Sequence, residues 1–70
     1  MTPTVGRIVH YYSGDIHSEP RGPYAALVVN DTGSIGLQIF PRNGETPWYQ
    51  DRVPYSEEPK AFHWTWPPRV

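Results

Sequence analysis

Aromatic and arginine side chains near the two ends of the chain are the groups best suited to binding a ligand. Aromatic rings and guanidinium planes hold nucleobases by stacking, at roughly 1–3 kcal/mol per base. An arginine fork also binds two phosphate oxygens at once. Residue chemistry alone does not say what the chain binds, but the side chains of these types near the two ends are the candidates for ligand contact: Arg7, His10, Tyr12, Trp64, Trp66 and Arg69.

Each of these residues also has a structural interpretation. Trp64 and Trp66 lie two apart on one expected strand and share a face, and a small domain needs such rings for its core. His10 can pack at the domain surface with one ring nitrogen satisfied. Arg69 follows two prolines near the chain end and is equally well interpreted as a frayed terminal residue.

The sequence lacks the common motifs of catalysis. It contains no phosphate-binding P-loop, no nucleophile elbow and no H-E-x-x-H zinc motif. There are 3 histidines and 7 acidic residues, without triad or metal spacing, and no cysteine. We predict no catalytic residue, no metal and no cofactor. A hydrolase built on His10 and His63 is the remaining enzymatic alternative.

Length and charge narrow the possible partners. A chain of 70 residues with 6 basic and 7 acidic side chains, net charge −1, predicts a single small domain over residues 1–70. This balance argues against a stable DNA or RNA complex, because such affinity depends on basic residues. No apolar run reaches the roughly 20 residues of a membrane span, and the first residues do not show the pattern expected of a signal peptide. We expect a cytoplasmic protein without membrane contact.

The 9 prolines leave little room for helices. Short runs rich in β-branched and aromatic residues, separated by Gly, Pro and Asn, predict strands. We expect an all-β fold, either a small five-stranded SH3-like barrel or a curled antiparallel sheet, with little or no helix. The expected strands are Arg7–Tyr12, Tyr24–Asn30, Ile35–Ile39, Trp48–Val53 and Ala61–Trp66, with residues 13–23 as a long first loop.

The clearest feature of this pattern is a hairpin from Tyr24 to Phe40. Its turn contains Gly33, which is free to adopt a positive φ. The run Ala25–Val29 is almost continuously apolar, which is typical of a strand covered on both sides. A domain of this size buries only about 60% of its unfolded surface, and self-association is a common remedy. We therefore expect a homo-oligomer.

The chain carries one sequence motif near each end, and the two motifs together resemble a family signature. Thr4-Val5-Gly6-Arg7-Ile8-Val9-His10-Tyr11 and Trp64-Thr65-Trp66-Pro67-Pro68-Arg69-Val70 resemble the opening and close of a family of small phage and prophage proteins. That family pairs V-G-R-I-V-H-Y with W-x-W-P-x-R-V around a variable middle. The resemblance covers the two ends, and residues 13–60 add only an ordinary hairpin pattern to it.

The family is in turn similar to phage anti-CBASS sponges, which are small oligomeric proteins that sequester the cyclic nucleotide signals of bacterial antiviral defence. The resemblance implies non-enzymatic binding of a cyclic di- or trinucleotide in the cytoplasm of an infected bacterium. It implies that the opening motif contributes Arg7, His10 and Tyr12 and that the closing motif contributes Trp64, Trp66 and Arg69. The same motifs equally fit a role in folding.

Two other functions remain open from the sequence. One is a phage structural or protein-interaction module, such as a capsid or tail accessory protein, which would use exposed sheet edges and the segment Pro67–Val70. The other is a binder of single-stranded or duplex nucleic acid, which the near-neutral charge disfavours.

Overall fold

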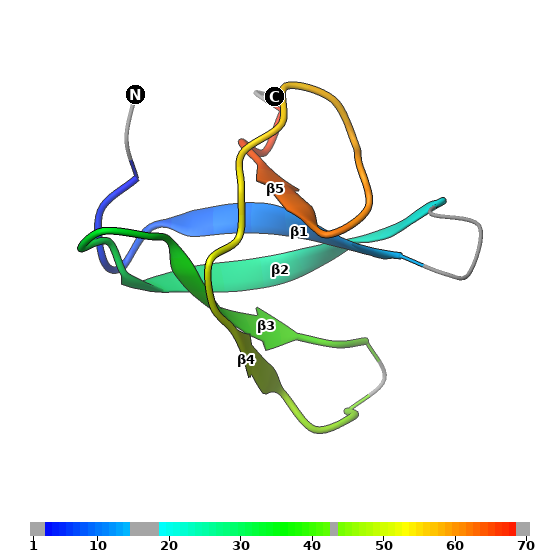
Figure 1. Ribbon diagram of the computed structural model, residues 1–70. Coiled ribbons are helices and arrows are strands. Elements are labelled where there is room, and N and C mark those ends of the chain that lie inside the picture. Colours follow the sequence, from blue (N-terminus) through cyan, green and yellow to red (C-terminus); the bar gives the residue numbers. More distant parts are fainter. Residues whose placement is uncertain (1–2, 15–18, 43, 69–70) are drawn as a thin grey trace.

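The protein folds as one curled antiparallel sheet of five strands, seen in a computed structural model that describes residues 3–14, 19–42 and 44–68 (Figure 1). The strand order is β4-β3-β2-β1-β5, so β4 and β5 form the two edges and the sheet does not close into a barrel. The described residues contain no helix, which confirms the all-β prediction in its curled-sheet form. The strands are β1 (Ile8–Gly14), β2 (Pro20–Asn30), β3 (Gly36–Phe40), β4 (Trp48–Gln50) and β5 (His63–Thr65).

The hairpin predicted over Tyr24–Phe40 is confirmed. β2 pairs with β3 from Ala25↔Phe40 to Val28↔Leu37. Gly33 in the connecting turn has φ 80°, the left-handed conformation that a residue without Cβ adopts at no steric cost.

One face of the sheet, which we call the inner face, packs the hydrophobic core. Its side chains come from alternate positions of β1, β2 and β3, as the two-residue period of a strand requires. Trp48 closes the core at the β4 edge, with its ring edge-on to Tyr11 and Tyr24 at centroid distances of 6.5 and 5.8 Å. The buried cluster consists of Val9, Tyr11, Ala26, Val28, Leu37, Ile39, Val53 and Trp64.

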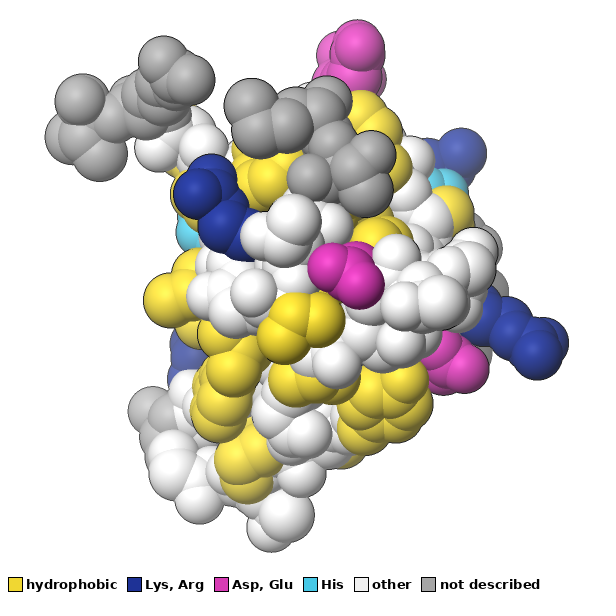
Figure 2. Space-filling model, turned by 90° about the vertical axis from the view of Figure 1, so that its left-hand side faces the viewer, with side chains coloured by type: hydrophobic (Ala, Val, Ile, Leu, Met, Phe, Trp, Pro, Cys, Tyr) yellow, Lys and Arg dark blue, Asp and Glu magenta, His cyan; other side chains and the backbone are white. Residues whose placement is uncertain are grey.

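The opposite face, which we call the outer face, is apolar and largely exposed from β1 to β4, whereas Thr65 on β5 is only 6% exposed. Strand register places one row across it: Ile8, Leu27, Gln38 and Tyr49. Ile8 is 63% exposed and Tyr49 50% exposed. Within the five strands as described, Arg21 is the single residue with a formal charge. Figure 2 views the molecule from the side and shows hydrophobic side chains spread over this view, with Lys and Arg near its margins.

The strand β2 is therefore covered on one side only. Ala26 and Val28 are buried, whereas Ala25 is exposed and Val29 is 40% exposed. The prediction of a strand covered on both sides is wrong for a single copy of the chain.

The first connection is shorter than residues 13–23, because β1 extends to Gly14 and β2 begins at Pro20. Pro20 is the first residue of its strand, and Gly22 and Pro23 together lie opposite Tyr12 where the register shifts. Strand starts and bulges are the positions at which a sheet accommodates proline. Residues 15–18 of the predicted loop lie outside the described residues.

The last two strands are also shorter than predicted. β4 ends at Gln50, and Arg52 has a left-handed φ of 53°. β5 begins at His63, because Phe62 has φ 64° and is 55% exposed, so Phe62 does not continue the strand beside Trp64. The chain between β4 and β5 instead runs across the sheet (Figure 1).

Candidate ligand-binding groove

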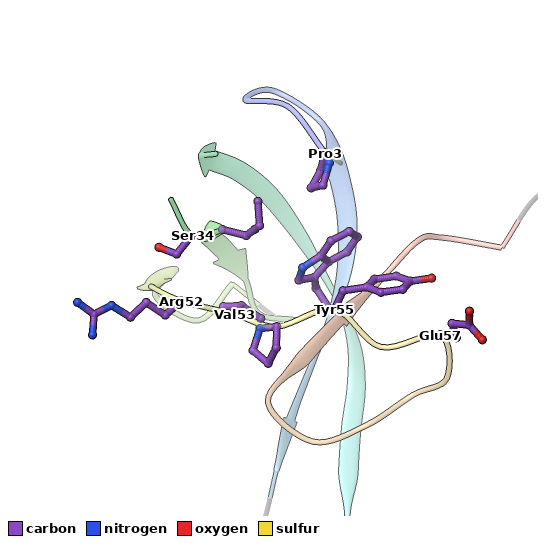
Figure 3. A pocket seen from close by; sticks show the side chains of 9 residues that line it. Pro3, Ser34, Arg52, Val53, Tyr55 and Glu57 are labelled. Carbon is purple, nitrogen blue, oxygen red and sulfur yellow. The ribbon is translucent and has the colours of Figure 1, made fainter. Parts of the chain in front are cut away.

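A groove with a volume of about 710 Å³ opens between the segment 51–57 and the sheet (Figure 3). This volume lies within the roughly 300–1,000 Å³ that is typical of small-molecule sites. Arg52 and Glu57 lie toward opposite ends of the groove, with Val53 and Tyr55 between them. Its lining consists of Pro3, Ser34, Ile35, Arg52, Val53, Pro54, Tyr55, Glu57 and Trp64.

Backbone hydrogen bonds hold this segment against the sheet. Val53 N–H donates to the carbonyl of Ile35 at 2.9 Å, just before β3. Trp64 N–H donates to the carbonyl of Pro54 at 3.0 Å, which forms a parallel bridge beside Tyr55. Pro54 lacks an N–H group and can only accept, so it fits a segment that borders the edge strand β5 without extending the sheet.

The groove continues into a row of rings that we call the aromatic ladder, defined as Tyr55, Trp64 and Trp66. The Tyr55 and Trp64 ring centroids are 4.8 Å apart, and those of Trp64 and Trp66 are 5.2 Å apart in a T-shaped pair. The Arg7 guanidinium carbon lies 5.4 Å from the Trp66 ring centroid. Tyr55 is 48% exposed and Trp66 is half-buried, so two of the three rings offer surface to a ligand.

The Asp51 carboxylate organises the end of the groove that carries Arg52. Its Oδ1 accepts hydrogen bonds from Arg52 N–H at 2.9 Å, Tyr49 Oη–H at 3.2 Å and Ser34 Oγ–H at 3.4 Å. Loss of hydration, followed by the charge of Asp51 and this hydrogen bond, raises the pKa of Tyr49. The bond to Arg52 N–H stabilises a left-handed backbone that a non-glycine residue adopts only at a cost.

The indole N–H of Trp64 is a buried hydrogen-bond donor without an acceptor among the described residues. The Trp64 side chain is 3% exposed. A buried donor without an acceptor costs about 1–3 kcal/mol. Because Trp64 also lines the groove, a ligand acceptor that reached this N–H would remove that cost.

The structure brings together three of the predicted site residues and separates two. Arg7, Trp64 and Trp66 meet at the aromatic ladder. His10 and Tyr12 lie opposite Thr65 and His63 in the register, on the outer face and away from the groove. Arg69 lies outside the described residues, so its predicted contact stays a prediction.

Sequence reasoning did not name Tyr55 or Arg52 as site residues. Asp51 offered a signal, since Asp is depleted in strands and favours turns. A turn at Asp51, followed by Pro54, would have predicted that the strand Trp48–Val53 ends before Asp51. Tyr55 would then belong to a separate segment that can contact another strand.

The described residues contain no group of three or more His, Asp or Glu side chains placed to hold a metal ion. A second hollow, of about 470 Å³, lies beside the β1–β2 hairpin and is lined by Pro20, Arg21, Gly22, Tyr24, Arg42 and Glu45.

Among all the residues that the structure describes, no helix has the length and apolar character needed to cross a membrane.

Comparison of the chain with models of protein families, with curated proteins and with solved structures returned no match.

Proposed function

We propose that the chain is a binding protein without turnover that sequesters a cyclic di- or trinucleotide signal in the groove. The observation that carries this proposal is the junction of the groove with the aromatic ladder and Arg7. The resemblance of both chain ends to a family of phage proteins similar to anti-CBASS sponges supports the same function, acting in the cytoplasm of an infected bacterium.

The groove offers the two kinds of contact that a cyclic nucleotide requires. Tyr55 is exposed enough for a base to stack on its ring, and such stacking is worth roughly 1–3 kcal/mol per base. Arg52 at one end of the groove and Arg7 beyond Trp66 supply guanidinium groups for phosphate oxygens.

The charge distribution favours a small nucleotide over a polymer. A chain with net charge −1 lacks the series of cations that holds a nucleic acid backbone. A cyclic di- or trinucleotide carries only a few phosphates, which two local arginines can partly neutralise. The proposal therefore names a small cyclic ligand rather than DNA or RNA.

The placement of the histidines supports binding rather than hydrolysis. His10 and His63 point to the outer face, where neither lines the groove. His63 Nδ1 lies 2.8 Å from the carbonyl of Ala61, so this nitrogen is engaged with the backbone. General acid–base catalysis needs a titratable group within hydrogen-bond reach of the substrate. Among the groove residues, Glu57 is the single carboxylate.

Calorimetric titration with a panel of cyclic di- and trinucleotides tests the proposal. We expect saturable binding and full chromatographic recovery of the intact nucleotide. Tyr55→Ala and Arg52→Ala should each weaken binding by roughly tenfold, the equivalent of about one stacking or phosphate contact. Arg42→Ala is the matched control, because Arg42 is exposed but lines the other hollow. Absence of binding by every cyclic nucleotide would refute the proposal, and recovery of cleaved nucleotide would replace it with a hydrolase.

The indole N–H resonances provide a local measurement of the same event. Trp64 and Trp66 should shift on addition of the nucleotide, and Trp48 should not, because Trp48 packs against Tyr11 and Tyr24 away from the groove. A downfield shift of Trp64 Nε1–H would indicate that the ligand supplies the missing acceptor.

The second candidate function is a phage structural or protein-interaction module, and the uncharged outer face is the observation that favours it. Quantitative mass spectrometry of purified virions discriminates the two. A fixed stoichiometry in the particle would favour the structural module, and absence from the particle with nucleotide binding would favour sequestration.

A further inference from the structure

We infer that the outer face of the sheet is a self-association surface, on which a second copy of this chain packs face to face. This inference does not depend on what the groove binds. It is carried by the contrast between the apolar composition of the outer face and the exposure of Ile8, Phe40 and Tyr49 on it.

The composition of the outer face departs from that of a solvated sheet. An antiparallel sheet with one face in water normally alternates apolar and polar side chains, with charge on the solvated side. Here Ile8, Val29, Phe40 and Tyr49 are 63%, 40%, 44% and 50% exposed on the outer face, and Leu27 is half-buried between them. Exposed apolar patches of this kind mark interaction sites.

Strand register makes these side chains contiguous. Ile8 lies opposite Leu27, and Leu27 lies opposite Gln38, so one row of side chains crosses three strands. A second row runs from His10 through Ala25 to Phe40. Adjacent strands are about 4.8 Å apart, so neighbouring side chains in each row are in contact distance.

The absence of charge favours a second copy as the occupant. A charged partner would need opposite charges to pair with, and the described strands supply only Arg21, at the far end of the β1–β2 hairpin. Apart from the Asp51 carboxylate beside Tyr49 at the β4 edge, the strands of two identical faces bring no like charges together, and a two-fold interface is built from one patch used twice. Sheets packed face to face lie about 10 Å apart with interdigitated side chains, a geometry that β-branched and aromatic residues fit.

The size of the face suits a dimer. A stable interface buries about 800 Å² on each partner. The molecule has extents of 30 × 28 × 26 Å and a total accessible surface of 5005 Å², so a dimer of that kind would use most of one face. Covering the outer face would also bury β2 on both sides, as its continuous apolar run requires.

Sedimentation equilibrium over a wide concentration range tests the inference with the full chain. We expect the wild-type protein to form a dimer, and Ile8→Lys to weaken dimerisation by roughly a hundredfold, because the symmetry places two buried charges in the interface. Tyr55→Lys is the matched control. Tyr55 is 48% exposed and lines the groove, away from the outer face. This variant should dimerise as the wild type does.

A milder variant and a direct contact measurement guard against a folding defect. Ile8→Thr keeps a β-branched residue in the strand and should weaken dimerisation by roughly tenfold. In a mixed-label sample, isotope-filtered NMR should detect contacts between subunits at the methyl groups of Ile8, Leu27 and Val29, and none at Leu37. A wild-type protein that stays monomeric at every concentration overturns the inference. So does a dimer whose affinity is unchanged in folded Ile8→Lys.

Discussion

The inner and outer faces of the sheet use similar residues and reach opposite outcomes. On the inner face, Val28 and Ile39 are 0% exposed and belong to the buried cluster that Val53 and Trp64 complete. On the outer face, Ile8 and Val29 are 63% and 40% exposed with nothing of the described chain over them. The difference shows that an apolar strand pattern specifies which side chains need cover. It does not specify whether the cover comes from the same chain.

Replacing one isoleucine on each face should give the largest contrast. Ile39→Ala should reduce the free energy of unfolding by about 2–5 kcal/mol, because it removes fully buried methyl groups and leaves a cavity. Ile8→Ala should change it by about 0.5 kcal/mol or less when the protein is dilute and monomeric. Urea denaturation at low protein concentration measures both values, and equal losses would break the distinction between the faces.

The same contrast explains how far the sequence predicts the structure. Alternation in β3 and the turn at Gly33 depend on neighbouring residues, so the hairpin from Tyr24 to Phe40 was predictable. The path of Asp51–Tyr55 depends on long-range hydrogen bonds, such as Val53 N–H to Ile35, which no local pattern encodes. For the candidate site, the sequence named Arg7, Trp64 and Trp66, which the structure brings together, and it missed Tyr55; that these residues bind a ligand stays a prediction.

Ionisation of Tyr11 should sharpen the comparison at alkaline pH. Burial on the inner face raises the pKa of Tyr11 above its ordinary value of 10.0. The unfolded chain then releases this proton at a lower pH than the folded chain does. The contribution of neutral Tyr11 to stability is therefore complete below pH 10.0 and is lost as the pH rises through the folded-state pKa.

Urea denaturation across this pH range, with Tyr11→Phe as the comparison, measures the effect. The wild-type free energy of unfolding should fall more steeply above pH 10.0 than that of Tyr11→Phe. Tyr55→Phe is a control on a side chain that is 48% exposed, and it should follow the wild type. Identical slopes for wild type and Tyr11→Phe would show that the buried phenol ionises as freely as it does in the unfolded chain.

The smallest expected effect concerns Asp51, where the two faces meet. Its carboxylate accepts from Tyr49 Oη–H on the outer face and from Arg52 N–H at the groove. Asp51→Ala should reduce stability by about 1 kcal/mol, the net value of a typical hydrogen bond, since the residue is exposed. It should also lower the pKa of Tyr49 toward 10.0, because the negative charge and the acceptor are both lost.

Spectrophotometric titration of tyrosinate, compared with a Tyr49→Phe background, isolates the Tyr49 signal. Asp31→Ala is the matched control, because Asp31 is an exposed carboxylate that accepts from Val5 N–H and does not contact Tyr49. If Asp51 also holds the left-handed backbone of Arg52, Arg52→Gly should restore part of the stability lost in Asp51→Ala, since glycine adopts φ 53° without strain. An unchanged Tyr49 titration in Asp51→Ala would show that Asp51 has no effect on the pKa of Tyr49 on the outer face. A shifted titration would confirm that the Asp51 carboxylate, which also accepts from Arg52 N–H at the groove, raises the pKa of Tyr49 on the outer face.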